Sequence, residues 1–486
     1  MMTAVHCKPC LYLSLAALLL TSCAASMTDY VPPLFDPLPA RHEVDTAHAI
    51  LVVRPLVQGH WRRAHARLRV AESAHRVGQI FAGIDQSALP FRLQIARHLY
   101  AEGRIDEALA HFARCAADGF IVPELYLEHG LGLLNNGRHR SARILIFAGQ
   151  DRFPDDAALA AAADRAIDED PLLFPPVLRT LVAADNNLIK SLGGGSTITL
   201  RYVEDGVTLA ALKPDQEQRQ SMYRSEIAFY RLCEVLRCRF RVPYNEEVRI
   251  SRQDFNTLYG RLDTPAQRGY RTKFHELVWR TVDGDTYLYA TFKEWMPAFV
   301  GFPIEVSEVW KGWLSATSRV DYGAPATDFL PAIAKAAGSR GQSGHSRRME
   351  WAARLSLGDL VAQISDVLVV DFLTNNWDRF AGEMDNYGAN CHFVEGGLLA
   401  LDNGAAFPPW HTDRVVRRLR LTQRFSKALI HGIRRLEYDK TLNRLFPTPT
   451  RDEIRAFDLF WERRDQLLTT VDELIERHGE AEILVF

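Results

Sequence analysis

Two aspartates in the second half of the chain have the setting expected of a phosphoryl-transfer site. Asp378 follows the largely apolar run "LVVDFLTNNW", and Asp402 follows the short apolar stretch "GGLLAL". Phosphoryl transfer uses one carboxylate to orient or deprotonate the attacking hydroxyl and another to bind the metal ion that bridges the phosphates. The two residues are 24 positions apart (402 minus 378), which is enough for two loops to bring them to one cleft.

A glycine-rich segment upstream could bind the phosphates. Residues 192–214, "LGGGSTITLRYVEDGVTLAALKP", contain two alternating runs around an Asp205-Gly206 turn, which predicts a β-hairpin. Lys213 at the end of the second strand would supply a positive charge. The alternative is a tight turn with a solvated lysine. The glycines whose backbone N–H groups would approach phosphate oxygens are Gly193, Gly194 and Gly195.

The next two segments offer further contacts to a nucleotide. "SMYRSEIAFYRLCEVL" has helical periodicity and carries Glu226 at the edge of its apolar face. A carboxylate there could orient Lys213 or hold a metal ion, although a surface glutamate is the alternative. In "GDTYLYATFKEWMPAF", the piece "KEWMP" would lie at the connection between two lobes of the domain. Its backbone groups would there contact an adenine ring. Its candidate nucleotide contacts are Glu294 and Met296.

A long apolar helix must position Asp378. "LSLGDLVAQISDVLVVDF" places apolar residues in helical register over 355–372, which predicts a core helix of a C-terminal lobe. The polar loop "LTNNWDRF" follows, and the buried helix would hold it rigid. The apolar run therefore ends in a carboxylate because the core presents a base at the mouth of a site.

Six motifs follow one another along the chain: the glycine hairpin, "ALKP", "SEIAFYRL", "RVP", "DFLTNNWDRF" and "LDNGAAF". In this order they resemble the secretory-pathway atypical kinases, the family of the Golgi casein kinase, the proteoglycan xylose kinase and four-jointed. The resemblance covers about residues 185–480. It implies an α+β, bilobal protein-kinase-like domain over 171–486. The all-α helical-repeat domain expected before it is unlike the animal members of the family, as is the lipobox-like N-terminus described below. The resemblance also implies ATP with Mn or Mg, and a hydroxyl acceptor, with a protein Ser/Thr favoured over a glycan sugar.

The resemblance assigns roles to single residues. Lys213 would bind phosphate, and Glu226 would pair with Lys213 or bind the metal. Asp378 would be the catalytic acid/base residue, and Asp402 would bind Mn or Mg. Asn390 is either a second residue on the metal side or a loop asparagine that supports a turn. The alternative function is a catalytically silent kinase-like scaffold that acts through its helical repeats.

The N-terminus indicates export. Residues 1–23 contain the apolar run "LYLSLAALLL" followed by "LTSC", which resembles a bacterial lipobox in which Cys23 becomes lipidated. A plain signal peptide or a membrane-anchoring stub is the alternative. The chain is therefore expected to be a membrane-anchored lipoprotein of the periplasm or cell surface, with 24–45 as a proline-rich linker. Because ATP is scarce there, the phosphate donor is left open.

Residues 46–170 carry a repeat. "AEGRIDEALAHF" and "NNGRHRSARILIF" align Gly103 with Gly137 and Ala108 with Ala142, 34 residues apart in both cases. This spacing is typical of tetratricopeptide repeats, while a helical bundle is the alternative. Either structure would serve as a surface for a protein partner rather than as the seat of chemistry.

Composition narrows the classes of partner and cofactor. The chain has 486 residues, 47% hydrophobic residues and a formal charge of -2, so two or three domains are expected and a general nucleic-acid binder is not. After Cys7 and Cys10 leave with the leader and Cys23 is lipidated, the remaining cysteines are Cys115, Cys233, Cys238 and Cys391. Their spacing contains no zinc motif, and the paired disulfide cysteines of the kinase family are not evident.

Overall fold

The computed structural model describes residues 89–486, except for 118, 120, 172, 176, 194–196, 219–220, 339–341, 381–387 and 389. The expected leader with Cys23, the proline-rich linker, Gly194 and Gly195 lie outside the described residues and stay predictions. The chain divides into two compact units, Met1–Phe174 and Pro175–Phe486. Within the described ranges, no helix combines the length and apolar character needed to cross a membrane.

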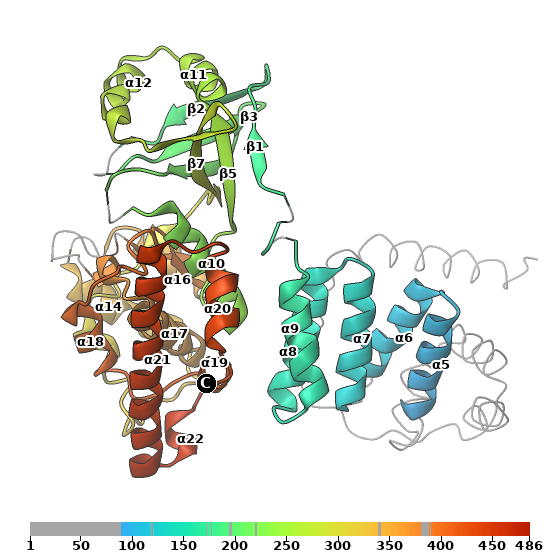
Figure 1. Ribbon diagram of the computed structural model, residues 1–486. Coiled ribbons are helices and arrows are strands. Elements are labelled where there is room, and N and C mark those ends of the chain that lie inside the picture. The colour runs from blue at the N-terminus through green and yellow to red at the C-terminus, as the bar shows by residue number, and fades with distance from the viewer. Residues whose placement is uncertain are drawn as a thin grey trace, which may run out of the picture. The chain divides into compact units, whose positions relative to one another are not determined.

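The described part of the first unit is helical (Figure 1). Gly103 and Gly137 have φ angles of 74° and 71°, the left-handed conformation in which glycine ends a helix without a Cβ penalty. Ala108 and Ala142 are fully buried, so their small side chains let successive helices pack closely. An all-α structure is confirmed for the described residues from Leu89 to Asp168, while the bounds of the domain and its identity as a tetratricopeptide array stay predictions. The helices are α5 (Leu89–Ala101), α6 (Ile105–Ala117), α7 (Pro123–Asn135), α8 (His139–Arg152) and α9 (Ala157–Asp168).

A close helix crossing in this unit predicts the effect of one added methyl group. A Cβ on Gly149 of α8 would lie 2.5 Å from the Cβ and 2.8 Å from the Cγ of Tyr126 on α7. Tyr126 is 2% exposed, so moving it would disturb the side chains packed around it. We expect Gly149→Ala to destabilise this unit by about 1–3 kcal/mol in thermal unfolding. Gly260→Ala is the control, because no atom lies within 4 Å of its Cβ position; an equal loss in both variants would contradict the prediction.

The second unit begins with a lobe built on a seven-stranded sheet. Its order is β1-β5-β7-β4-β3-β2, with β6 beside β7, and all pairs are antiparallel except β1 with β5. The expected hairpin is confirmed as β3 and β4, which meet at the Asp205-Gly206 turn. The strands are β1 (Arg179–Leu181), β2 (Asn187–Ser191), β3 (Leu200–Glu204), β4 (Val207–Pro214), β5 (Asn245–Ser251), β6 (Trp279–Val282) and β7 (Asp285–Glu294).

Alternation along the strands separates two faces of this sheet. Leu212, Val248 and Phe292 belong to a core cluster that also contains residues of the helices α11 (Arg252–Gly260) and α12 (Pro265–Tyr270). The opposite face carries α10 (Tyr223–Leu236), which packs against β5 and β7. In Figure 1, α11 and α12 lie at the outer end of this lobe and α10 lies at its junction with the helical lobe.

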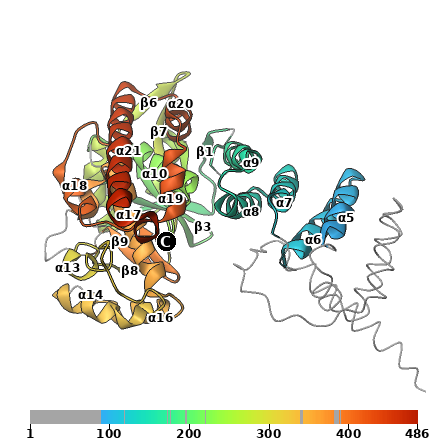
Figure 2. The ribbon, with the colours of Figure 1, turned by 90° about the horizontal axis from the view of Figure 1, so that it is seen from below.

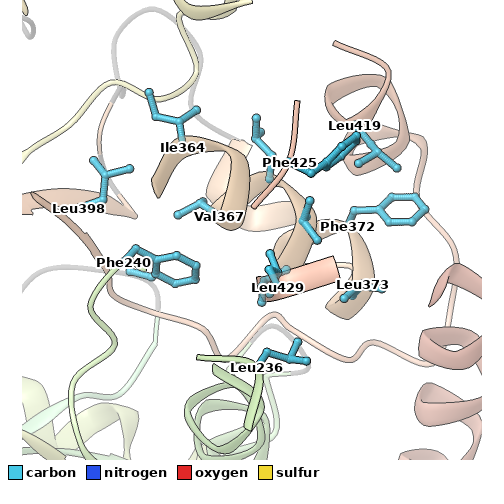
Figure 3. Close-up of a cluster of buried hydrophobic side chains, with 14 of the residues drawn as sticks. Leu236, Phe240, Ile364, Val367, Phe372, Leu373, Leu398, Leu419, Phe425 and Leu429 are labelled. Carbon is cyan, nitrogen blue, oxygen red and sulfur yellow. The ribbon is translucent and has the colours of Figure 1, made fainter. Parts of the chain in front are cut away.

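The helical lobe is organised around the predicted core helix, here α17 (Leu357–Thr374). The helix begins at Ser356, whose side chain forms a capping box with Asp359, and it ends at Asn375 in the left-handed conformation. From Leu360 to Thr374 all of its side chains are buried, and Figure 3 shows Ile364 and Phe372 among the other apolar side chains of the core cluster. An apolar helix surrounded by other elements gives the loop that follows it a rigid base.

The remaining elements of this lobe surround α17. A small sheet has the order β10-β9-β8, and α14 packs against α16 at one edge of the lobe (Figure 2). A sheet lobe joined to a mainly helical lobe is the bilobal α+β fold that was predicted. The elements are β8 (Val300–Gly301), α13 (Ser307–Trp310), η3 (Ala326–Asp328), α14 (Leu330–Ala336), α16 (His345–Trp351), η4 (Trp377–Phe380), β9 (Cys391–Val394), β10 (Gly397–Ala400), α18 (Asp413–Leu419), α19 (Lys427–Arg434), α20 (Tyr438–Leu445), α21 (Arg451–His478) and α22 (Glu480–Ile483).

Candidate active site

Lys213 and Glu226 form a buried ion pair in the sheet lobe. Lys213 lies near the end of β4 on the face opposite to the core residue Leu212, and it is 2% exposed. Glu226 lies in the first turn of α10 and is 0% exposed. The Nζ atom of Lys213 is 3.0 Å from Oε1 of Glu226. A charge buried this deeply requires a partner. The sequence left open whether Glu226 pairs with Lys213 or binds a metal ion, and the structure shows the pair with Lys213.

Asp402 joins this pair from the helical lobe. It follows β10, has a φ angle of 54°, and its Oδ1 accepts a hydrogen bond from Nζ of Lys213. Its side chain remains 48% exposed. Burial opposes ionisation, but Lys213 and then Lys293 outweigh it and hold the pKa of Asp402 well below its usual range. Asp402 is therefore a carboxylate at neutral pH.

The glycine after Asn403 permits this approach. A Cβ on Gly404 would lie 2.8 Å from Nζ of Lys213 and 3.2 Å from Cα of Ser221. The carbonyl oxygen of Gly404 also accepts a hydrogen bond from the backbone N–H of Met222, at the N-terminus of α10. The loop that carries Asp402 is thus fastened directly to the helix that carries Glu226.

Asp378 lies in the short helix η4, immediately after α17. The Nδ2 atom of Asn390 donates to its Oδ2 at 3.0 Å and to its backbone oxygen at 3.1 Å. Burial and the negative charge of Asp402 raise the pKa of Asp378, while Lys213 and the bond from Asn390 lower it. The charges of Asp402 and Lys213 therefore both act on Asp378. Asn390 supports Asp378, and its role toward a metal stays a prediction.

Arg379 connects the loops of the two aspartates, and the sequence reasoning assigned it no role. Its side chain is fully buried and lies between α17 and the segment after β10. Asp371 lies within the apolar helix predicted over 355–372. A charged residue in such a run, followed by an arginine, is the sequence signal for a buried ion pair. The guanidinium donates to Asp371 Oδ2 at 2.6 Å, Asn390 O at 2.5 Å, Leu401 O at 3.2 Å and Asn403 Oδ1 at 2.5 Å.

Met296 and Glu294, the two residues predicted to contact the nucleotide base, lie in different environments. Met296 is buried in a small apolar cluster with Val394 and Leu399. The carboxylate of Glu294 accepts from Arg241 Nη2 at 2.8 Å and from the backbone N–H of Tyr244 at 3.3 Å. Its side chain therefore braces the connection between the lobes.

Two further residues of this region are Gly193, which the sequence predicts to contact phosphate, and Lys293. Gly193 has a φ angle of 76° with no atom within 4 Å of its Cβ position, and its predicted contact with phosphate stays a prediction. Lys293, at the other end of the ion-pair cluster, was named only as the start of "KEWMP". Its Nζ lies 3.0 Å from Oε2 of Glu226. It is the main charged residue here that the sequence analysis missed.

The site can be tested for its fit to a metal ion. In the part of the chain that the structure describes, no three His, Cys, Asp or Glu side chains converge closely enough to chelate a metal. Mg²⁺ is usually held by one or two carboxylates together with substrate phosphates and water. The half-exposed, ionised Asp402 with Asp378 nearby fits that pattern. Both oxygens of Glu226 face lysines, so its role as a metal ligand stays a prediction.

A buried glutamate that accepts hydrogen bonds from the backbone of Gly388 predicts a pH effect on stability. Both carboxylate oxygens of Glu305 accept from the backbone N–H of Gly388, at 3.0 and 3.1 Å. Burial, opposed by hydrogen bonds and then by Arg418 and Arg379, raises the pKa of Glu305 from 4.5 to about 7. The folded state then holds the proton more tightly than the unfolded state. Ionising Glu305 therefore removes about 3 kcal/mol of stability as pH rises from 4.5 to about 7.

The substitution Glu305→Gln isolates this effect, because the amide keeps an acceptor for Gly388 and does not titrate. We expect the parent to lose stability relative to Glu305→Gln between pH 4.5 and 7, as measured by chemical denaturation across that range. Glu308→Gln, at an exposed neighbouring position, is the control and should follow the parent. A constant difference between parent and Glu305→Gln at all pH values would contradict the prediction.

Comparisons with known proteins leave the family open. No family model matches the chain, and no curated protein matches it. Among solved structures, a crystal structure of the Golgi casein kinase with Mn/ADP bound is similar over 66% of this chain and 79% of that chain, with 13% sequence identity and a TM-score of 0.37. A likeness this distant assigns no activity and no residue role to the chain.

Proposed function

We propose that this chain is a metal-dependent kinase that transfers the γ-phosphate of ATP to a hydroxyl acceptor, with a protein Ser/Thr favoured over a glycan sugar. The observation that supports this most is the convergence of four charged residues from separate elements. Lys213 of β4, Glu226 of α10 and Asp402 after β10 are directly joined, and Asp378 of η4 lies close enough for Asp402 to raise its pKa.

Each residue has a role that follows from its chemistry. Asp378, with its raised pKa, orients the acceptor hydroxyl and takes its proton. Lys213 presents an ammonium group to the phosphate oxygens. Asp402 and the donor phosphates hold Mn or Mg, which supplies positive charge against the charge that develops on the phosphates. Glu226 keeps Lys213 directed into the site.

The alternative is a silent scaffold that acts through its helical unit. One observation favours it: Lys213, Lys293, Glu226 and Asp402 neutralise one another, so these charges have partners within the protein itself. A kinase must exchange some of these pairings for contacts with the donor. The two hypotheses therefore differ in whether nucleotide and metal bind together.

Thermal unfolding of the full chain with ATP, with and without Mn, separates the two. A kinase is stabilised by about 2.7 kcal/mol when the ligand is at 100 times its Kd, and only when both components are present. Transfer of label from γ-labelled ATP to a general protein acceptor then tests catalysis. Asp402→Asn should abolish both signals and Asp285→Asn, at an exposed turn, neither. No stabilisation of the parent would favour the scaffold.

We also propose that the chain is exported and lipid-anchored at Cys23, as the "LTSC" motif indicates. Detergent partitioning of the parent and Cys23→Ala tests this. The parent should enter the detergent phase and Cys23→Ala should leave it, whereas equal partitioning would count against the anchor. If ATP proves to be a poor donor in the transfer assay, other phosphate donors of that compartment are the next to be assayed.

A further inference from the structure

Lys293 lies on the same face of the sheet as Lys213. In the register of β4 with β7, Lys293 is opposite Ala211 and Lys213 is opposite Thr291, so the two lysines are diagonal neighbours on adjacent strands. The alternate residues Leu288, Ala290 and Phe292 of β7 belong to the core on the other face. Lys293 is 9% exposed. The sheet thus presents two buried ammonium groups side by side toward α10.

Glu226 lies between these two lysines. Its Oε1 is 3.0 Å from Nζ of Lys213, and its Oε2 is 3.0 Å from Nζ of Lys293. Asp402 pairs with Lys213 on the other side. Two ammonium groups and two carboxylates therefore balance. Because Glu226 is 0% exposed, it needs a counter-charge in every state of the site.

Phosphoryl transfer would break the ion pairs that Lys213 makes with Glu226 and Asp402. Lys213 has to approach the phosphates of the donor, and Asp402 has to bind the metal. If Lys213 were its only partner, Glu226 would be left as a buried, uncompensated carboxylate, which is strongly unfavourable. The Nζ of Lys293 lies 3.0 Å from the oxygen of Glu226 that does not pair with Lys213, so this ion pair can persist when Lys213 moves.

We propose that Lys293 is a positioning residue that holds Glu226 in the site independently of Lys213, so that Lys213 can turn to the donor phosphate. This proposal rests on the proposed kinase function. It assigns two tasks to two lysines: Lys213 contacts the donor, and Lys293 supplies the fixed counter-charge. Glu226 keeps its place, and with it the N-terminal part of α10, while the partners of Lys213 change.

A double-mutant cycle tests the independence of Lys293. Lys213→Met imitates the departure of Lys213, and Glu226→Gln, Lys293→Met and the combined variant are made in that background. Chemical denaturation of the ligand-free full chain measures their stabilities. We expect a coupling between Glu226 and Lys293 of about tenfold or more in the unfolding equilibrium constant. Additive effects of the two substitutions would overturn the proposal.

Nucleotide binding gives a second readout that does not depend on the triple variants folding. With Lys213 intact, titration calorimetry with Mn·ADP should show a loss of affinity of about tenfold in Lys293→Met, because Lys213 is then retained by Glu226. Lys293→Arg, which keeps the charge, should recover to within about threefold of the parent. Lys335→Met, at an exposed position on α14, is the matched control.

The two failures can be told apart. A parent that does not bind Mn·ADP would refute the kinase function, and the cycle would then decide alone whether Lys293 holds Glu226. A parent that binds Mn·ADP with the same affinity as Lys293→Met would overturn the role of Lys293 and leave the kinase function standing. A Lys293→Arg variant as weak as Lys293→Met would also count against the role.

Discussion

Replacing Asp378 with asparagine is expected to slow phosphotransfer by about 100- to 10,000-fold, the usual contribution of a general acid or base. The amide is nearly the same shape and can still accept the hydrogen bond from Asn390, but it cannot take a proton from the acceptor. We therefore expect Mn·ADP to bind the variant as it binds the parent. Initial rates with γ-labelled ATP, beside calorimetric titration with Mn·ADP, measure both quantities.

The pH dependence of the rate is a second test of Asp378 as the general base. Activity requires ionised Asp378, so the rate should fall on the acid side as pH drops through its raised pKa. The hydrogen bond from Asn390 lowers that pKa, after burial and Asp402 have raised it. Asn390→Ala should therefore move the acid limb to higher pH. Asp285→Asn should leave rate and profile unchanged; a similar loss there, or full activity in Asp378→Asn, would reject Asp378 as the base.

Replacing Arg379 with methionine is expected to destabilise the second unit by about 3–5 kcal/mol, the cost of breaking a buried ion pair from one side. At a pH above its pKa, Asp371 would hold an unpaired charge in the core, since both side chains are 0% exposed. The carbonyl oxygens of Asn390 and Leu401 would lose a donor as well. Chemical denaturation beside Arg319→Met, at an exposed position, measures the loss.

The loss of stability caused by Arg379→Met should increase with pH. Burial already raises the pKa of Asp371 to about 6 against the opposing effect of Arg379, so removing Arg379 raises it further. Protonation relieves the unpaired charge, and the penalty of Arg379→Met should therefore be smaller at pH 5 than at pH 8. The double variant Asp371→Leu, Arg379→Met should be more stable than Arg379→Met alone. Equal penalties at both pH values would mean that the arginine acts through packing only.

The loss of Arg379 should also reach the site. Its guanidinium connects the loop of Asp378, through Asn390, with the loop of Asp402, through Leu401 and Asn403. Without it, the two aspartates are no longer held at a fixed separation. Activity measured at a temperature where Arg379→Met is still folded should thus be lower than that of the parent, whereas Arg319→Met should retain it.

Local patterns in the sequence determined which residues could react and which elements carry them. The 3.6-residue periodicity predicted α17 and α10, and the Asp205-Gly206 turn predicted the hairpin of β3 and β4. These features depend on neighbouring residues, so they can be read from a short window. The strands β1 and β2 were missed, because β1 has three residues and joins the sheet by pairing with β5, far along the chain.

Tertiary structure decided which charges neutralise one another. Lys293 reads as part of a lobe connection, and only the register of β7 with β4 places it beside Lys213 and across from Glu226. Arg379 reads as a loop arginine beside Asp378, and only the folded core shows that it joins two loops. The physical reason is the same in both cases. A side chain's own type and spacing indicate its chemistry, but the partner that a buried charge requires is supplied by whichever distant segment the fold brings against it.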